Sequence, residues 1–208
     1  INSLMDYKAK VKNDLSIQRT YIQPNNKLGI YRYVRGKGIV SFTDNQIHTL
    51  RYQVRNVHRN KSTLSFEVRG DSSCCSKDTS ETEYLKKMPY QVANTFSAEE
   101  IKIDFPAHAF YDTLRFNYNI ENSAHRNYFS GIHHIHNRYT PVHKFFTLSI
   151  KAKNLDQHLI EKAFIAKIEE DNEYQYQGGK ELNGYISTKV RKFGRYAVMV
   201  DTISPDIK

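Results

Sequence analysis

Alternation of apolar and polar residues with a period of two runs along most of the chain and constrains its fold more than any other feature. Seven segments carry apolar residues at every second position: 50–54, 64–68, 101–105, 114–120, 146–150, 164–168 and 196–200. Successive side chains of a β-strand point to opposite faces, so each segment is predicted to be a strand with one face against a core. Helical spacing is scarce, and we expect only one short helix within 4–15 and a turn or two within 155–163.

Turn-forming residues separate the predicted strands. They gather at 24–26, 35–38, 58–61 and 177–179, where Gly, Pro and Asn are the residues that turns prefer. Short strands joined by such turns are typical of antiparallel sheets. We therefore predict a mainly β fold made of two immunoglobulin-like antiparallel β-sandwich units.

A break in composition divides the chain, because residues 70–83 contain no large apolar side chain. We predict a β-rich unit at residues 1–70, a linker or long loop at 71–94 and an immunoglobulin-like β-sandwich at 95–208. The first unit has few strands for a closed sandwich. The start at Ile1 and the end shortly after Pro205 lead us to expect a piece of a longer protein, with strands of the first unit upstream.

Composition excludes several classes of protein. The 208 residues include 12% aromatic and 25% charged residues, which argues against a disordered chain. No apolar run approaches the roughly 18 residues of a membrane span. The two cysteines, Cys74 and Cys75, are adjacent and cannot form a disulfide framework. Free thiols and a disulfide to a segment outside this chain both stay open for them.

A zinc-like pattern is the main candidate for chemistry. His108 and Asp112 form an H-x-x-x-D, and His134 and His136 form an H-x-H. Three imidazoles and a carboxylate can hold a catalytic zinc, and two histidines at alternate strand positions would share a face. However, the interval between His108 and His134 has little glycine, and no glutamate adjoins the histidine pair as a general base. We therefore predict no catalytic, cofactor-binding or metal residue, and keep a zinc hydrolase on these four as the rival.

The net charge of +9 together with 15 tyrosines raises nucleic-acid binding as a function. The basic residues, such as Arg32, Arg51 and Arg55, are scattered, and no nucleic-acid motif is present. We therefore do not expect a nucleic-acid partner, and the positive charge favours an anionic cell envelope instead. Glycan binding on exposed tyrosines stays open, although the chain has no tryptophan.

Five stretches of the chain form a recognisable set. They are residues 17–31 and 48–68 in the first part, followed by 139–144, 192–196 and 201–207 in the second. In this order they resemble the region downstream of the catalytic domain in lysostaphin-like (LytM-type) zinc metallopeptidases of Gram-negative bacteria. One position departs from the pattern, because Arg59 stands where such proteins often have a glycine beside asparagine.

The resemblance implies an exported, periplasmic or envelope-located peptidoglycan metallopeptidase homologue. Its zinc would be held by an H-x-x-x-D and an H-x-H in an upstream domain, and no cofactor is expected within this chain. His108, Asp112, His134 and His136 match the letters but not the spacing, so no zinc ligand is carried over. The implied partners are the upstream peptidase domain, a downstream domain and peptidoglycan or other envelope components. The implied role is non-catalytic, in spacing, positioning or envelope docking, and the rival is a stand-alone binding module for glycan or an envelope protein.

Overall fold

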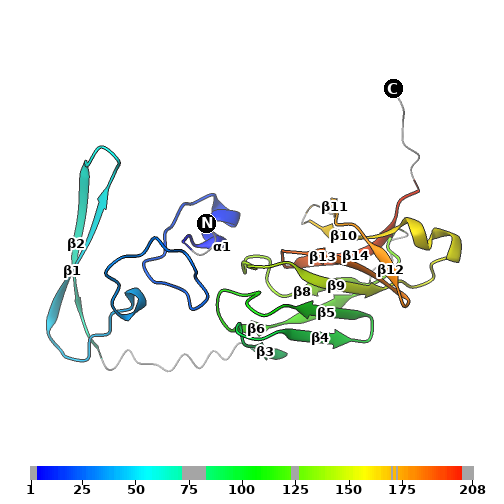
Figure 1. Cartoon of the computed structure of the whole chain (residues 1–208), viewed down its shortest axis with the longest axis horizontal. Coiled ribbons are helices and arrows are strands. Elements are labelled where there is room, and N and C mark those ends of the chain that lie inside the picture. Colours follow the sequence, from blue (N-terminus) through cyan, green and yellow to red (C-terminus); the bar gives the residue numbers. More distant parts are fainter. Residues whose placement is uncertain (1–3, 72–82, 123–126, 170, 172, 203–208) are drawn as a thin grey trace. The chain divides into compact units, whose positions relative to one another are not determined.

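The computed structural model describes residues 4–71, 83–122, 127–169, 171 and 173–202, which fall into two compact units (Figure 1). One unit combines residues 1–32 with 83–208, and the other comprises residues 33–82. Strands predominate in both, and all of the paired strands are antiparallel. The prediction of a mainly β, antiparallel fold is therefore confirmed, while the immunoglobulin-like type and the boundaries at residues 70 and 95 stay predictions.

The larger unit is a sandwich of two five-stranded sheets. The first sheet has the order β11-β10-β14-β8-β7, with bounds Tyr174–Tyr176, Ala163–Ile168, Gly194–Val200, Ile132–Ile135 and Tyr118–Glu121. The second sheet has the order β12-β13-β9-β5-β4, with bounds Lys180–Leu182, Tyr185–Val190, Phe146–Lys151, Ile101–Phe105 and Asn94–Ala98. Alternate residues of both sheets point into one core, which is the arrangement that the period of two predicted.

Smaller elements complete this unit. β3 (Lys86–Met88) pairs with β6 (Leu114–Phe116), so part of the stretch predicted as a linker is a strand. The expected helical segments are α1 (Tyr7–Asn13) and the 3₁₀ helix η3 (Gln157–Lys162). Among the described residues no helix is long and apolar enough to cross a membrane.

Asn25 joins the N-terminal segment to the sandwich. Its side-chain amide donates to the carbonyl oxygen of Phe110 at 2.6 Å, and its backbone N–H donates to the carbonyl oxygen of Tyr111 at 3.0 Å. Asn25 is buried, and these bonds give its side-chain and backbone N–H groups partners within the fold. The turn predicted at 24–26 therefore anchors the segment rather than merely reversing the chain.

Aromatic rings fill the centre of the sandwich core. The ring of Phe105 lies 4.7 Å from that of Phe146 and 6.1 Å from that of Phe193, and Phe193 in turn lies 5.7 Å from Phe146. These spacings fall within the range in which aromatic pairs attract beyond simple burial. Phe193 precedes β14 of the first sheet, whereas Phe105 and Phe146 belong to the second sheet, so the cluster joins the two layers.

Strand β10 departs from simple alternation, because all six of its residues are buried. Ala163 and Ile165 face the main core. Phe164, Ala166 and Ile168 belong to a second buried cluster on the other face of the sheet, together with residues of β8 and β14. A strand with both faces covered reads as a continuous apolar run, and this explains the sequence of β10.

The smaller unit contains one long hairpin of β1 (Ile47–Arg55) and β2 (Lys61–Arg69). Its apolar residues share one face, as predicted, but most of that face is exposed instead of half-buried. The reason is that the described residues of this unit form no second sheet to cover it. At the tip, Arg59 adopts a left-handed backbone with φ of 66°. A glycine would adopt this conformation without strain, whereas a residue with a side chain rarely does.

We expect Phe193→Ala to lower the free energy of unfolding by about 3–5 kcal/mol, because it removes a fully buried ring from the layer contact. Urea denaturation followed by circular dichroism measures this change. Phe145→Ala is the matched control. The Phe145 side chain is 56% exposed, and its loss should change stability by about 0.5 kcal/mol or less. Equal effects of the two substitutions would contradict the central place of Phe193.

Candidate functional site

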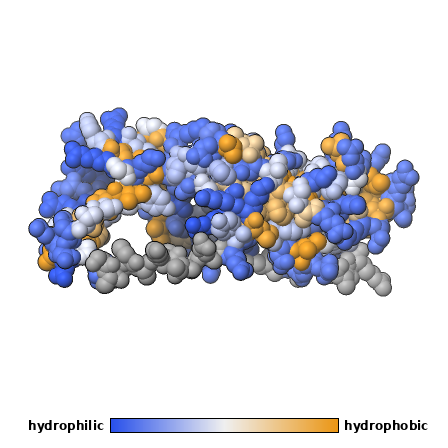
Figure 2. Space-filling view, turned by 90° about the horizontal axis from the view of Figure 1, so that it is seen from below, coloured by the Kyte–Doolittle hydropathy of each residue, from blue (hydrophilic) through white to orange (hydrophobic). Residues whose placement is uncertain are grey.

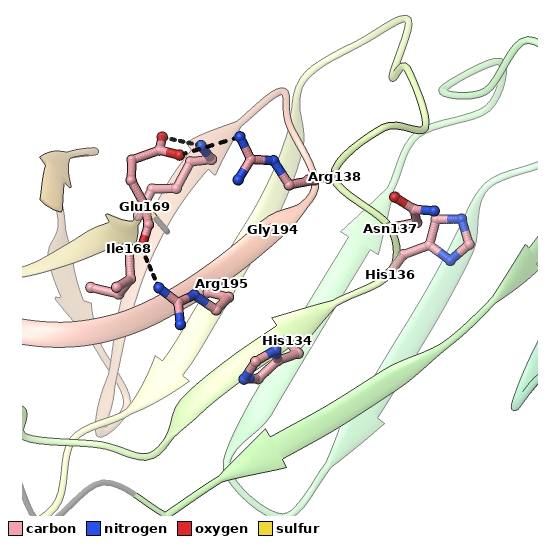
Figure 3. A pocket seen from close by; sticks show the side chains of 9 residues that line it. His134, His136, Asn137, Arg138, Ile168, Glu169, Gly194 and Arg195 are labelled. Carbon is pink, nitrogen blue, oxygen red and sulfur yellow. Dashed lines mark hydrogen bonds and ion pairs between the residues drawn. The ribbon is translucent and has the colours of Figure 1, made fainter. Parts of the chain in front are cut away.

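A cavity of about 280 Å³ lies at one end of the first sheet (Figure 3). Its walls come from the ends of β8 and β10, the loop after β8 and the start of β14. The charged and titratable residues that line it are His134, His136, Arg138, Lys167, Glu169 and Arg195. The cavity is therefore the place in the sandwich where ionisable side chains of three neighbouring strands meet.

Strand register positions these residues. Arg195 of β14 pairs with His134 of β8 on one side and with Ile168 of β10 on the other. The preceding residue, Gly194, has φ of 147°, and a Cβ built on it would lie 3.2 Å from Cε of Lys167. Glycine at this position thus leaves room for the lysine side chain to run past the start of β14.

Glu169 organises the positive charges of the cavity. Its carboxylate forms an ion pair with Lys167 and lies 3.9 Å from the guanidinium of Arg138 (Figure 3). Its carbonyl oxygen accepts a hydrogen bond from Arg195. Lys167 is buried, and burial of an ammonium group is costly unless a carboxylate compensates it. Glu169 therefore compensates the charge of the buried Lys167. Because three cationic side chains line the cavity together with this one carboxylate, this end of the sheet has an excess of positive charge.

The two histidines of the H-x-H pattern do not share a face. His134 lies on the sheet surface, where its Nε2 is 3.1 Å from the carboxylate of Glu121. β8 ends at Ile135, and His136 adopts a left-handed backbone with φ of 48°. The change of backbone conformation takes His136 out of the strand alternation, so the expectation of a shared face is wrong.

The ring of His136 packs within the core instead. It lies 6.1 Å from the ring of Phe116 and 5.0 Å from that of Phe193. Its Nε2 is 3.1 Å from the hydroxyl of Thr140, and the backbone N–H of Asn117 donates to its Nδ1 at 3.4 Å. Both ring nitrogens thus have partners within the fold, and the residue has a packing role.

His108 and Asp112 lie apart from this pair, in the loop between β5 and β6. The backbone N–H of His108 donates to the carbonyl oxygen of Tyr90 at 2.7 Å. The carboxylate of Asp112 accepts the backbone N–H of Thr113 at 2.6 Å. In the described part of the chain, no group of three or more His, Cys, Asp or Glu residues is arranged to hold a metal ion. Cys74 and Cys75 lie outside the described residues.

The charged residues of the cavity were missed by the sequence analysis. One signal was available, because Lys167 follows Ala163 and Ile165 at the core-facing positions of an otherwise apolar strand. A lysine at such a position needs a buried partner, and Glu169 is the nearest carboxylate in sequence. Arg138 and Arg195 had no comparable signal, because they reach the cavity only through the pairing of β8 with β14.

Burial controls the titration of two histidines. It lowers the pKa of His133 to about 4 and that of His136 also to about 4, from the usual value near 6.5. His133 is fully buried, and its Nδ1 lies 2.9 Å from the hydroxyl of Tyr118. Burial likewise raises the pKa of Tyr118 to about 12, so this pair is neutral at physiological pH.

We expect Glu169→Gln to destabilise the protein by about 1–3 kcal/mol, because it leaves the buried ammonium of Lys167 without a charged partner. Denaturation at pH 7 measures the change. Glu121→Gln removes the carboxylate beside His134 on the surface and should cost about 0.5 kcal/mol or less. A neutral effect of Glu169→Gln would show that Lys167 does not need this carboxylate.

We also expect stability to fall on acidification through the window between about pH 6.5 and pH 4. In the folded protein the pKa values of His133 and His136 lie below those of unfolded histidine, so the unfolded chain binds more protons in this window. Urea denaturation at several pH values measures the fall. Nitrogen-detected NMR titration should show both rings neutral at pH 5.5. Midpoints near 6.5 for either ring would contradict its burial as the neutral form.

A family model described as Zu5-like domain matches residues 85–201, the stretch that contains β3 to β14. The match spans more than half of the chain, so the chain belongs to the Zu5-like domain family. A search of curated proteins found no match.

Proposed function

We propose that the chain is a non-catalytic β-sandwich region that spaces, positions or docks an exported lysostaphin-like peptidoglycan metallopeptidase homologue at the cell envelope. The observation that carries the proposal is the use of the four zinc-type residues. His134 contacts Glu121, His136 packs in the core, and Asp112 caps a backbone N–H. The fourth residue, His108, donates its backbone N–H to the carbonyl oxygen of Tyr90, so each of the four has a different place in the scaffold. This arrangement argues for a scaffold rather than for hydrolysis by these residues.

The stretches that carry the resemblance also support a scaffold role. In residues 139–144, the backbone N–H of His143 donates to the carbonyl oxygen of Ala109 at 2.7 Å, and the ammonium of Lys144 donates to that of Ala107 at 2.7 Å. These bonds tie the segment before β9 to the loop after β5. Residues engaged in such contacts serve the fold, and under this proposal the activity would belong to the upstream domain.

The segment 192–196 contributes in the same way. The hydroxyl of Tyr196 donates to the carbonyl oxygen of Lys192 at 2.7 Å, while Phe193 between them fills the core. Tyr196 is fully buried, so the bond satisfies the hydroxyl group of its side chain. The segment leads directly into β14, where Arg195 lines the cavity.

Charge supports docking at an envelope. The chain carries a formal net charge of +9, and the cavity gathers Arg138, Lys167 and Arg195 around one described carboxylate. Peptidoglycan and envelope lipids carry carboxylate and phosphate groups, and a cationic protein is attracted to them over about a Debye length. A stand-alone binding module for glycan or an envelope protein would draw on the same charge and is the second candidate.

The experiment is a pull-down of the purified chain with isolated Gram-negative sacculi. We expect retention at about 0.05 M salt that weakens by about 0.3 M, because surface charges are screened at the higher concentration. His134→Ala should leave retention unchanged. A neutral polysaccharide resin serves as the control for non-specific adhesion.

Metal analysis of the same preparation distinguishes the non-catalytic proposal from the alternative that the chain is itself a zinc hydrolase. Stoichiometric zinc that disappears in His134→Ala, together with peptidoglycan cleavage by the chain itself, would overturn the non-catalytic proposal. If the chain is not retained on sacculi at low salt, docking on peptidoglycan is excluded as its role. Spacing or positioning of the peptidase domain would then be the role to test in the complete protein.

A further inference from the structure

The hairpin of β1 and β2 presents an apolar face that the fold leaves bare. Val54 is 69% exposed and Leu64 is 62% exposed, and beside them the stacked rings of Tyr52 and Phe66 are also exposed. These four residues lie on one face, because Tyr52 pairs with Leu64 and the period of two brings Val54 and Phe66 to the same side. Hydrophobic and hydrophilic patches alternate on the surface of this unit, at the left of the view in Figure 2.

Among the described residues of its unit, those that support the hairpin contact its base. Phe42 stacks on the ring of His48 at 4.2 Å, and Asp44 lies 2.6 Å from Nε2 of the same histidine. Beyond this point the ribbon is two strands wide, and an isolated two-stranded sheet is only marginally stable in water. A contiguous exposed apolar face on such an element indicates an interaction surface.

The charge of the hairpin identifies the kind of surface it fits. Residues 47–69 contain five Lys and Arg residues and one carboxylate, that of Glu67. The cations are Arg51, Arg55, Arg59, Lys61 and Arg69. On the polar face Arg55 pairs directly with Lys61, so two positive charges sit side by side next to the tip. An apolar face combined with excess positive charge is the pattern that binds an anionic lipid interface.

The tip distinguishes a lipid surface from a covering protein sheet. Val57 is 92% exposed and lies in the turn, outside the paired strands, between Arg55 and Arg59. A second sheet packed on the ribbon would cover Val54 and Leu64 but would not require an apolar tip or a cationic reverse face. A bilayer interface accommodates the apolar face, the apolar tip and the cationic reverse face together. The long aliphatic parts of arginine and lysine side chains can extend past a narrow ribbon, so that their charged ends reach the lipid headgroups.

We propose that the β1–β2 hairpin docks on an anionic phospholipid surface, with Tyr52, Val54, Leu64 and Phe66 toward the acyl chains and the tip cations at the phosphates. The proposal deepens the envelope docking proposed above and rests on it. It names the lipid headgroup and acyl boundary as the ligand, whereas the sacculus experiment tests peptidoglycan.

The test is cosedimentation of the full chain with vesicles of phosphatidylcholine containing about one-third phosphatidylglycerol, compared with pure phosphatidylcholine. We expect at least tenfold stronger partitioning onto the anionic vesicles. The pair Val54→Gln and Leu64→Gln should weaken partitioning at least tenfold, because apolar side chains then no longer enter the interface. The matched control, Gln53→Asn with Thr63→Ser, changes neighbouring positions on the opposite face and should bind as the parent chain does.

A second variant guards against loss of hairpin structure. Arg55→Gln with Lys61→Gln leaves the apolar face intact and should reduce partitioning onto anionic vesicles about tenfold or more, with little change on neutral ones. No partitioning, equal partitioning onto both vesicles or unchanged binding by the Val54 and Leu64 variant would each overturn the proposal. A further contradicting result is a dimer in sedimentation velocity that the Val54 and Leu64 variant abolishes, together with no retention on vesicles. The apolar face would then pair with a second copy of the chain.

The two failures can be told apart. Vesicle binding without sacculus retention would support lipid docking and exclude peptidoglycan as the ligand. Sacculus retention without vesicle binding would overturn the hairpin proposal and leave the proposed function standing.

Discussion

Packing of phenylalanine rings between the two sheets is the interaction on which the rest of the sandwich depends. Within each sheet the strands hydrogen-bond to one another, so the two layers are held together mainly by the packing of side chains between them. Phe105 and Phe146 from one layer meet Phe193 from the other. Because Phe193 directly precedes β14, this contact also sets where Gly194 and Arg195 begin the strand, and thereby where the charged cavity forms.

The polar residues of the sandwich follow from the same packing. His136 contacts Phe193 and is held as the neutral form, while Lys167 passes Gly194 and pairs with Glu169. Such residues look like candidates for chemistry when they are read one at a time. In the fold Lys167 pairs with Glu169, and both ring nitrogens of His136 have partners, so these two residues stabilise the boundary of the hydrophobic core.

The two units of the chain handle apolar surface in different ways. The Zu5-like domain family model matches residues 85–201, and in this stretch the alternate apolar residues are buried between the two sheets. The hairpin has the same alternation, but the described part of its unit forms no second sheet against it, so its apolar residues remain at the surface. The same sequence pattern thus gives a buried core in one unit and an exposed apolar face in the other.

Strand positions and facing could be predicted from sequence because the period of two is a local property of extended backbone. Ile101, Ile103 and Phe105 are buried as their spacing predicted, and the helix at Tyr7–Asn13 lies within the expected stretch. The candidate site could not be predicted in the same way. His134 and His136 have the spacing of a shared strand face, yet β8 ends at Ile135 and His136 itself adopts a left-handed backbone. The ring of His136 packs against the rings of Phe116 and Phe193, which are distant in sequence. Local spacing does not encode such contacts.

What the amino-acid order determined by itself is a mainly β, antiparallel chain with defined apolar faces and a positive charge, since all of these are set by neighbouring residues and composition. Only the tertiary structure decides which apolar faces are buried and which charged residues, distant in sequence, lie together. Arg138, Lys167 and Arg195 converge on one end of a sheet because three strands from separate parts of the chain pair in register. Such convergence depends on contacts between residues far apart in sequence, and no local pattern specifies them.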